Sequence, residues 1–156
     1  MWNYIVKNDC NAICLHDCQV TGMHVDGKDL ILDFADGFWM ESNSEHNPGE
    51  NTVRTSASQI RFANFEVETL YVYKEIRMFG KKVMTTRNEM TLQTFIDNVN
   101  SKVWKPEIIH NFRKSRTSLL NGWISHQSRQ YLEFEFSMYS EDVSYFWNDL
   151  CEDRIW

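Results

Sequence analysis

The sequence has little glycine and proline, with six and two among its 156 residues. A membrane-spanning helix needs an uninterrupted apolar run of about 18 residues, and the sequence has no run that approaches this length. We expect no signal peptide, because a basic start followed by an apolar stretch is missing. These absences exclude a collagen-like, low-complexity or wholly disordered chain. The length predicts a single domain over residues 1–156, which we expect to be cytoplasmic and without a membrane partner.

Cysteine is also scarce, and its spacing favours no chemistry. Zinc prefers thiolate and imidazole, and His16 lies among three of the cysteines, but a four-residue spacing on a strand separates neighbouring sulfurs by about 13 Å. A nucleophilic thiol would need a base from elsewhere, since His16 and Asp17 point to opposite faces of a strand. We therefore expect free thiols, and no metal, no cofactor and no catalytic residue. The four cysteines are Cys10, Cys14, Cys18 and Cys151.

Aromatic residues, in contrast, are dense, with ten Phe, six Tyr and six Trp. Apolar residues recur mainly at every second position, which is typical of a strand with one buried face. The clearest example is residues 131–138, where Leu132, Phe134, Phe136 and Met138 alternate with Tyr131, Glu133, Glu135 and Ser137. Asp26-Gly27 and Asp36-Gly37 are typical of tight turns, and they predict a three-stranded meander over residues 19–40.

One segment follows the helical period instead. Leu92, Phe95, Ile96 and Val99 form the apolar stripe of an amphipathic helix at about 91–100, with Thr91 as its N-cap. Residues 41–52 are polar and predict a mobile loop, and Asn121-Gly122 resembles a turn. For residues 142–156 a short helix and an edge segment remain equally open. The fold class is therefore α+β: a mostly antiparallel sheet, as a meander or curled sheet, with one helix packed on it.

Charge is distributed unevenly along a chain of net charge −6. Residues 101–130 hold six basic residues and one acid, and their aromatic neighbours Trp104, Phe112 and Trp123 could stack on bases. An acidic chain nevertheless disfavours nucleic acid as the partner. Residues 131–156 hold seven acids and one base, and their mixture of rings and acids is typical of an interface for a basic protein. The candidate partner-binding residues are Tyr145, Trp147, Asp149, Glu152 and Asp153, unless the rings complete the core.

Three segments of the first half resemble a group of small, uncharacterised bacterial β-rich proteins, some of which are immunity proteins of polymorphic toxin systems. The segments are Leu15-His16-Asp17-Cys18-Gln19-Val20, Asp29-Leu30-Ile31-Leu32-Asp33-Phe34 and Ile60-Arg61-Phe62. This resemblance implies a rigid scaffold that needs no catalysis and that binds a toxin through a charged, aromatic face.

The first functional hypothesis is therefore a non-enzymatic, cytosolic protein-interaction domain, of the immunity type if the resemblance holds, that binds a basic toxin. The alternative is a small-molecule-binding domain or a small enzyme with a pocket between helix 91–100 and the sheet. A homo-oligomer that pairs its basic and acidic segments between subunits also remains open.

Overall fold

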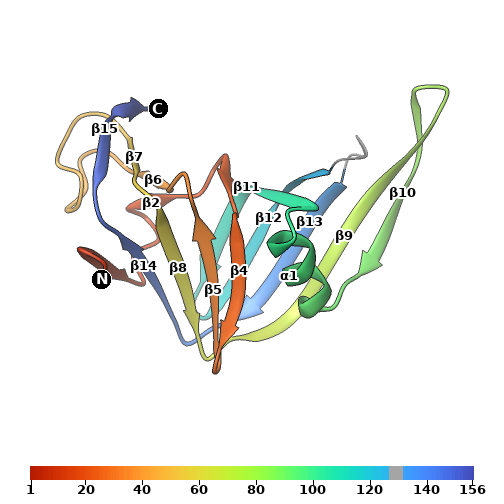
Figure 1. Ribbon diagram of the computed structural model, residues 1–156, viewed down its shortest axis with the longest axis horizontal. Helices are drawn as coiled ribbons and strands as arrows, with labels where there is room; N and C mark the ends of the chain where they lie inside the picture. The colour runs from red at the N-terminus through yellow and green to blue at the C-terminus, as the bar shows by residue number, and fades with distance from the viewer. Residues whose placement is uncertain (127–131) are drawn as a thin grey trace.

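The computed structural model describes residues 1–126 and 132–156, which form three antiparallel sheets and one helix (Figure 1). The five-stranded sheet has the order β1 (Tyr4–Lys7), β14 (Asp142–Trp147), β8 (Ser58–Ala63), β5 (Asp29–Phe34), β4 (Gly22–Asp26). The six-stranded sheet has the order β10 (Lys81–Glu89), β9 (Glu66–Met78), β13 (Leu132–Tyr139), β12 (Thr117–His126), β11 (Trp104–Lys114), β3 (Cys18–Gln19). The four-stranded sheet has the order β15 (Leu150–Ile155), β7 (Val53–Thr55), β6 (Trp39–Met40), β2 (Ile13–Cys14).

The four-stranded sheet continues the five-stranded one around a corner. Strands β14, β8 and β5 are neighbours in one sheet, and their continuations β15, β7 and β6 are neighbours in the same order in the other. At this corner Gly37 has a φ of +77°, and a β-carbon there would lie 2.2 Å from the carbonyl oxygen of Thr55. The predicted meander is therefore wrong at its third strand: Asp36-Gly37 leads the chain around the corner, so that β6 pairs with β7 and β2.

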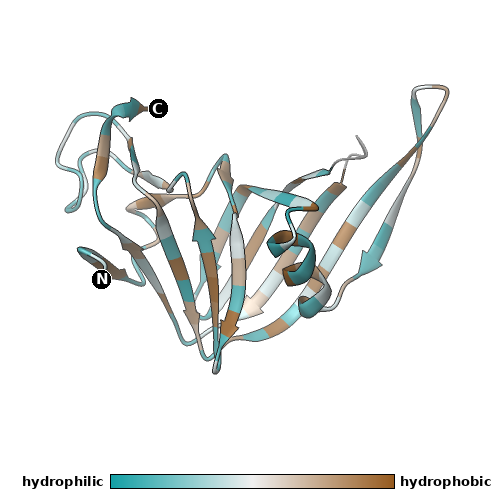
Figure 2. Ribbon diagram, in the orientation of Figure 1, coloured by the Kyte–Doolittle hydropathy of each residue, from teal (hydrophilic) through white to brown (hydrophobic). Residues whose placement is uncertain are grey.

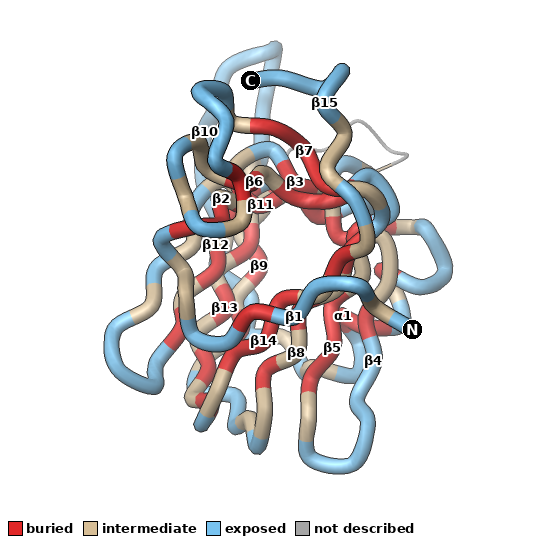
Figure 3. Tube along the Cα trace, turned by 90° about the vertical axis from the view of Figure 1, so that its left-hand side faces the viewer, coloured by how far each residue is buried: buried red, intermediate tan, exposed pale blue. Residues whose placement is uncertain are grey.

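The five- and six-stranded sheets form the two sides of a V (Figure 1). They are joined because two neighbouring strands continue from one sheet into the other. Strand β8 leads into β9, and β13 leads into β14, so both connections lie at the base of the V. The inner faces of the sheets enclose the hydrophobic core, and the buried segments in Figure 3 line this interior. The core is one cluster that includes Leu32 and Ile60 from one sheet and Leu70 and Phe136 from the other.

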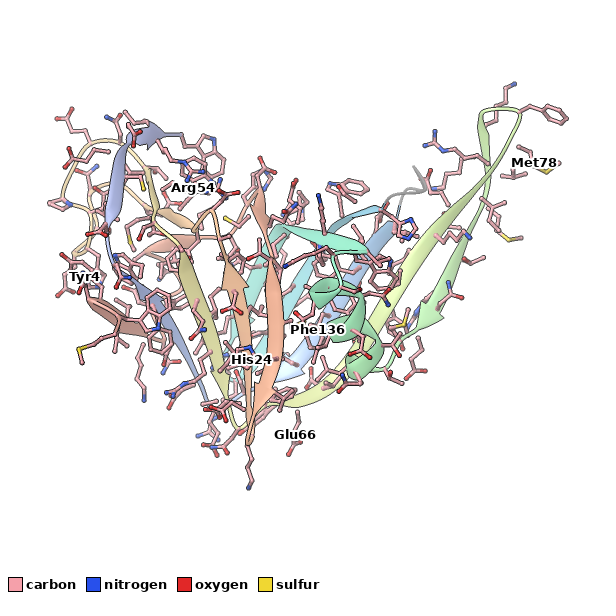
Figure 4. The ribbon with its side chains drawn as sticks, viewed as in Figure 1. Tyr4, His24, Arg54, Glu66, Met78 and Phe136 are labelled. Carbon is pink, nitrogen blue, oxygen red and sulfur yellow. The ribbon has the colours of Figure 1, made fainter. Side chains whose placement is uncertain are left out.

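The period-two prediction for residues 131–138 is confirmed wherever the structure describes them; Tyr131 lies outside the described residues. Along β13 buried and half-buried residues alternate strictly, and Phe136 is only 2% exposed and points into the core (Figure 4). Residues 142–156, for which a helix or an edge segment was open, form the interior strand β14 and the edge strand β15.

The predicted helix is confirmed as α1 (Leu92–Asn100), with the Thr91 hydroxyl accepting a hydrogen bond from the amide of Thr94. Its apolar residues Phe95, Ile96 and Val99 are buried in the core between the two sheets. The side-chain amide of Asn100 donates to the carbonyl of Met23 at 2.8 Å and accepts from its N–H at 3.0 Å. The helix thereby covers the edge strand β4, which would otherwise expose unpaired backbone groups. In the described part of the chain, no helix has the length and hydrophobicity to cross a membrane.

The two segments predicted to be irregular have different outcomes: residues 41–52 form a loop of turns and bends, whereas residues 121 and 122 do not form a turn. Within residues 41–52 the side-chain amide of the buried Asn47 donates to the carbonyls of Met40 and Asn51, which ties the polar loop to the body. The prediction of a turn at Asn121-Gly122 is wrong, because strand β12 runs through both residues without reversing direction. Gly122 instead stands opposite a bulge in β11.

Candidate binding surface

The structure does not bring the five predicted partner-binding residues together on one face. Tyr145 and Trp147 are 4% and 1% exposed, and both rings pack edge-on against Phe38 in the core. Burial raises the pKa of Tyr145 well above its usual value. Asp149, in contrast, is exposed at the corner between β14 and β15. The two rings therefore complete the core, which was the alternative interpretation of this segment.

The two remaining acids, Glu152 and Asp153, lie exposed on the edge strand β15. Asp149 lies at the start of the same segment, where β14 continues into β15. Binding of a basic partner by these three acids stays a prediction, but without the aromatic anchors that motivated it.

The cysteines and His16 lie where thiol chemistry is disfavoured. Burial raises the pKa of the Cys18 thiol to about 12, and burial also raises that of Cys14. A nucleophilic thiol requires the opposite shift, because the thiolate is the reactive form. The His16 ring stacks on Trp156 with centroids 5.5 Å apart, and its Nδ1 lies 2.9 Å from the carbonyl oxygen of Ile109. Within the described residues, no three His, Cys, Asp or Glu side chains are placed to hold a metal ion.

The space between α1 and the sheets is filled by side chains. The cavity there has a volume of about 10 Å³ and lies among Met23, Phe95 and Phe134. A cavity of that size holds about one water molecule. The alternative hypothesis placed a small-molecule pocket at this position, and the cavity that the described residues form there is too small for such a ligand.

A larger hollow lies on the outer face of the six-stranded sheet, where no other element of the described chain covers it. It has a volume of about 340 Å³ and extends over β9, β13, β12 and β11. We call it the outer-face hollow. Its lining residues are Tyr73, Ile109, His110, Asn121, Gly122, Trp123, Glu133, Phe134 and Glu135.

The strand register aligns the side chains of the outer-face hollow in two rows. Glu133 is paired with Tyr73 on one side and with Trp123 on the other. Glu135 is paired with Tyr71 and Asn121. Directly paired residues point to the same face and have β-carbons about 4.5–5.5 Å apart, so each carboxylate lies next to an aromatic ring. Trp123 is 48% exposed, which leaves part of its indole available to a partner.

The floor of the hollow depends on Gly122. The bulge in β11 brings its backbone so close that a β-carbon on Gly122 would lie 1.9 Å from the carbonyl oxygen of Glu107 and 3.0 Å from the amide nitrogen of Ile109. Only glycine fits this approach. Bulges often adjust the direction of side chains next to functional sites. Here the bulge places His110 opposite Asn121 at the rim of the hollow.

The charge of the lining favours a cation. Glu133 and Glu135 are its two formally charged residues, and no basic side chain of the described chain forms a salt bridge with either. The same sheet face already holds one guanidinium: that of Arg87 lies 3.6 Å from the ring centroid of Tyr71. The Tyr71 phenol raises the pKa of Arg87, and the charge of Glu135 adds to the effect. An aromatic ring beside a carboxylate therefore binds a guanidinium on this surface.

The basic segment 101–130 does not form a continuous stacking surface. Trp104 is buried against Phe95, whereas Phe112 and Trp123 are exposed. The Arg113 guanidinium donates to Ser118 and Ser140, which fixes it to the body. Arg129, the last basic residue of this segment, lies outside the described residues.

Comparison with known proteins gives no match to a protein family, to a curated protein or to a solved structure.

Proposed function

We propose that the chain is a non-enzymatic protein-interaction domain that binds a basic partner through the outer-face hollow. The observation that carries the proposal is the position of Arg87 over Tyr71 beside Glu135. The neighbouring row offers the same chemistry, with Glu133 between two aromatic residues. Arg87 is paired with Tyr73 of this row, but no basic side chain of the described chain forms a salt bridge with Glu133.

The partner's chemistry follows from the lining. An arginine side chain can stack its planar guanidinium on Trp123 or Tyr73 and donate to a carboxylate at the same time. A lysine ammonium is a more strongly hydrated point charge, so it gains less from the rings. The hollow therefore favours an arginine-rich segment over a lysine-rich one. The resemblance to immunity proteins implies a toxin as the partner, and a toxin with an arginine-rich basic segment is a partner of this kind.

The test is calorimetric titration of the protein with an arginine-rich peptide and with a lysine-rich peptide of equal length and charge. We expect tighter binding of the arginine peptide. We also expect the variant Glu133→Gln/Glu135→Gln to weaken it at least tenfold, which corresponds to about 1.4 kcal/mol.

The matched control is Glu152→Gln/Asp153→Asn, which removes the same charge from the exposed part of β15. This variant should leave the affinity for the arginine peptide unchanged. If the control weakens binding and the hollow variant does not, the acidic C-terminal strand is the binding surface and the proposal is wrong.

A further inference from the structure

A second exposed surface lies at the end of the β9–β10 hairpin. Within the described residues, the last pair between β9 and β13 is Lys74 with Leu132, and the rest of β9 is paired with β10. We call residues 75–85 the arm. The part of β9 that belongs to the arm, Glu75 to Met78, extends about 13 Å past the last described pair with β13. Figure 1 shows the arm reaching away from the body, and Figure 4 places Met78 near its end.

The arm is unusually apolar for an exposed hairpin. Its large exposed apolar side chains are Ile76, Met78, Phe79, Val83 and Met84. Ile76 and Met84 are paired, so they lie on the same face. Figure 2 shows that the arm carries both hydrophobic and hydrophilic residues. Contiguous exposed apolar residues of this kind mark an interaction site in a folded protein.

The turn at the end of the arm presents a ring at some cost in backbone strain. Phe79 has a φ of +50° and Gly80 a φ of +77°, and Phe79 is fully exposed. Asparagine or glycine normally occupies the first of these positions, because a bulky residue is strained there. Strain that places a side chain in solvent indicates a function for that side chain.

The arm is also basic, and its edge is protected against strand pairing. Residues 75–85 hold Arg77, Lys81 and Lys82 against one acid, a net charge of +2 in a chain of −6. On one face Glu75 forms salt bridges with Arg77 at 2.8 Å and with Lys82 at 3.0 Å, which stiffens the hairpin. Lysines and the bulge between Lys82 and Met84 are features that oppose edge-to-edge pairing of β10. The end of the arm, rather than its edge, is therefore the docking element.

We infer that the arm of one chain docks into the outer-face hollow of a second copy. The two surfaces are complementary in charge: the arm carries an exposed ring and lysines, and the hollow of about 340 Å³ carries two carboxylates and aromatic rings. An ammonium gains less from the rings than a guanidinium does, so the arm binds the hollow more weakly than an arginine-rich segment does. The arm does not reach its own hollow, because Tyr73 of the hollow lies just before the arm on β9, which continues away from it (Figure 1).

Two-fold symmetry lets both copies make this contact at once. In such a dimer each arm occupies the partner's hollow, so every contact occurs twice. A standard interface buries about 800 Å² of surface on each partner, and the end of one hairpin buries less than this. We therefore expect the two contacts together to form a weak, concentration-dependent dimer. The inference rests on the proposed function, because the second copy's arm and the basic partner use the same hollow.

The test is sedimentation velocity over a range of protein concentrations. Phe79→Asn removes the ring and places a residue that tolerates the turn, so the variant keeps its fold. We expect it to weaken the dimer at least tenfold. The control Val25→Ser removes an exposed apolar residue from another hairpin and should leave the dimer unchanged.

Charge reversal tests the pairing itself. Lys81→Glu/Lys82→Glu and Glu133→Lys/Glu135→Lys should each abolish the dimer, and the chain carrying all four changes should restore it. A protein that is monomeric at every concentration, or a dimer that Phe79→Asn leaves intact, overturns the inference. A monomer that binds vesicles containing anionic phospholipid, and loses that binding on Phe79→Asn, also overturns it and assigns the arm to a membrane.

The outcomes separate the two proposals. A monomer that still binds the arginine peptide through Glu133 and Glu135 overturns the dimer alone. A dimer that depends on the arm and the hollow but binds no peptide supports the inference and overturns the proposed function. If both hold, Phe79→Asn should bind the peptide more tightly than the unaltered chain, because the arm no longer competes for the hollow.

Discussion

The two faces of the six-stranded sheet are built from the same strands and differ in burial and chemistry. Along β13 the inner residues Phe134 and Phe136 are buried in the core, whereas Glu133 and Glu135 line the hollow, each next to at least one aromatic ring. The inner face contributes stability through buried apolar area. The outer face buries little and instead exposes rings and carboxylates, so its residues are available to a partner. In the proposed function, stability and recognition are thus separated by the alternation of side chains along one strand.

Paired substitutions on β13 test this separation most strongly. Phe136→Ala should lower the free energy of unfolding by about 3–5 kcal/mol, because it leaves a cavity in a packed core. Glu135→Ala, one residue away on the opposite face, should change it by less than about 0.5 kcal/mol. Urea denaturation measures both. Equal losses from the two variants would mean that the outer face is structural as well.

Gly122→Ala tests whether the bulge defines the floor of the hollow. A β-carbon 1.9 Å from the carbonyl oxygen of Glu107 forces β11 to shift, which should cost about 1–3 kcal/mol or more. The control Gly27→Ala has nothing within 4 Å of its new β-carbon and should lose about 1 kcal/mol from its positive φ alone. Thermal unfolding compares the two, and a Gly122→Ala variant as stable as the unaltered chain would contradict the account of the bulge.

The smallest expected effect concerns a polar contact on the surface. The Asn8 amide and the Lys7 ammonium lower the pKa of Asp142 below its usual value. A lowered folded-state pKa stabilises the fold above the unfolded value of about 3.9, and this contribution is lost as pH falls through the lowered pKa. As the pH is lowered below 4, the urea midpoint of Asp142→Asn should therefore fall less steeply than that of the unaltered chain. The exposed Asp149→Asn serves as the control, and identical pH profiles for the unaltered chain and Asp142→Asn would contradict the prediction.

The local elements of this fold were predictable because they depend on neighbouring residues. The period of two along β13, the stripe of α1 and the Asp26-Gly27 turn are all local signals. The order of strands was not predictable, because the corner at Gly37 and the continuation of β14 into β15 arise from contacts between distant segments.

The same limit applies to the site. The sequence identified Glu133 and Glu135 as the polar face of a strand and Trp123 as a ring beside basic residues. Only the register of β9, β13 and β12 shows that these side chains are neighbours. Tyr145 and Trp147 were misplaced for a related reason: β14 lies inside its sheet, so rings next to acids in sequence point into the core.

The most direct test of the central claim is NMR mapping of backbone amide shifts on titration with the arginine-rich peptide. We predict that the perturbed amides cluster around Tyr73, Trp123, Glu133 and Glu135, on the outer face of the six-stranded sheet. Perturbations confined to Asp149, Glu152 and Asp153 would contradict the account and place recognition on the acidic C-terminal strand.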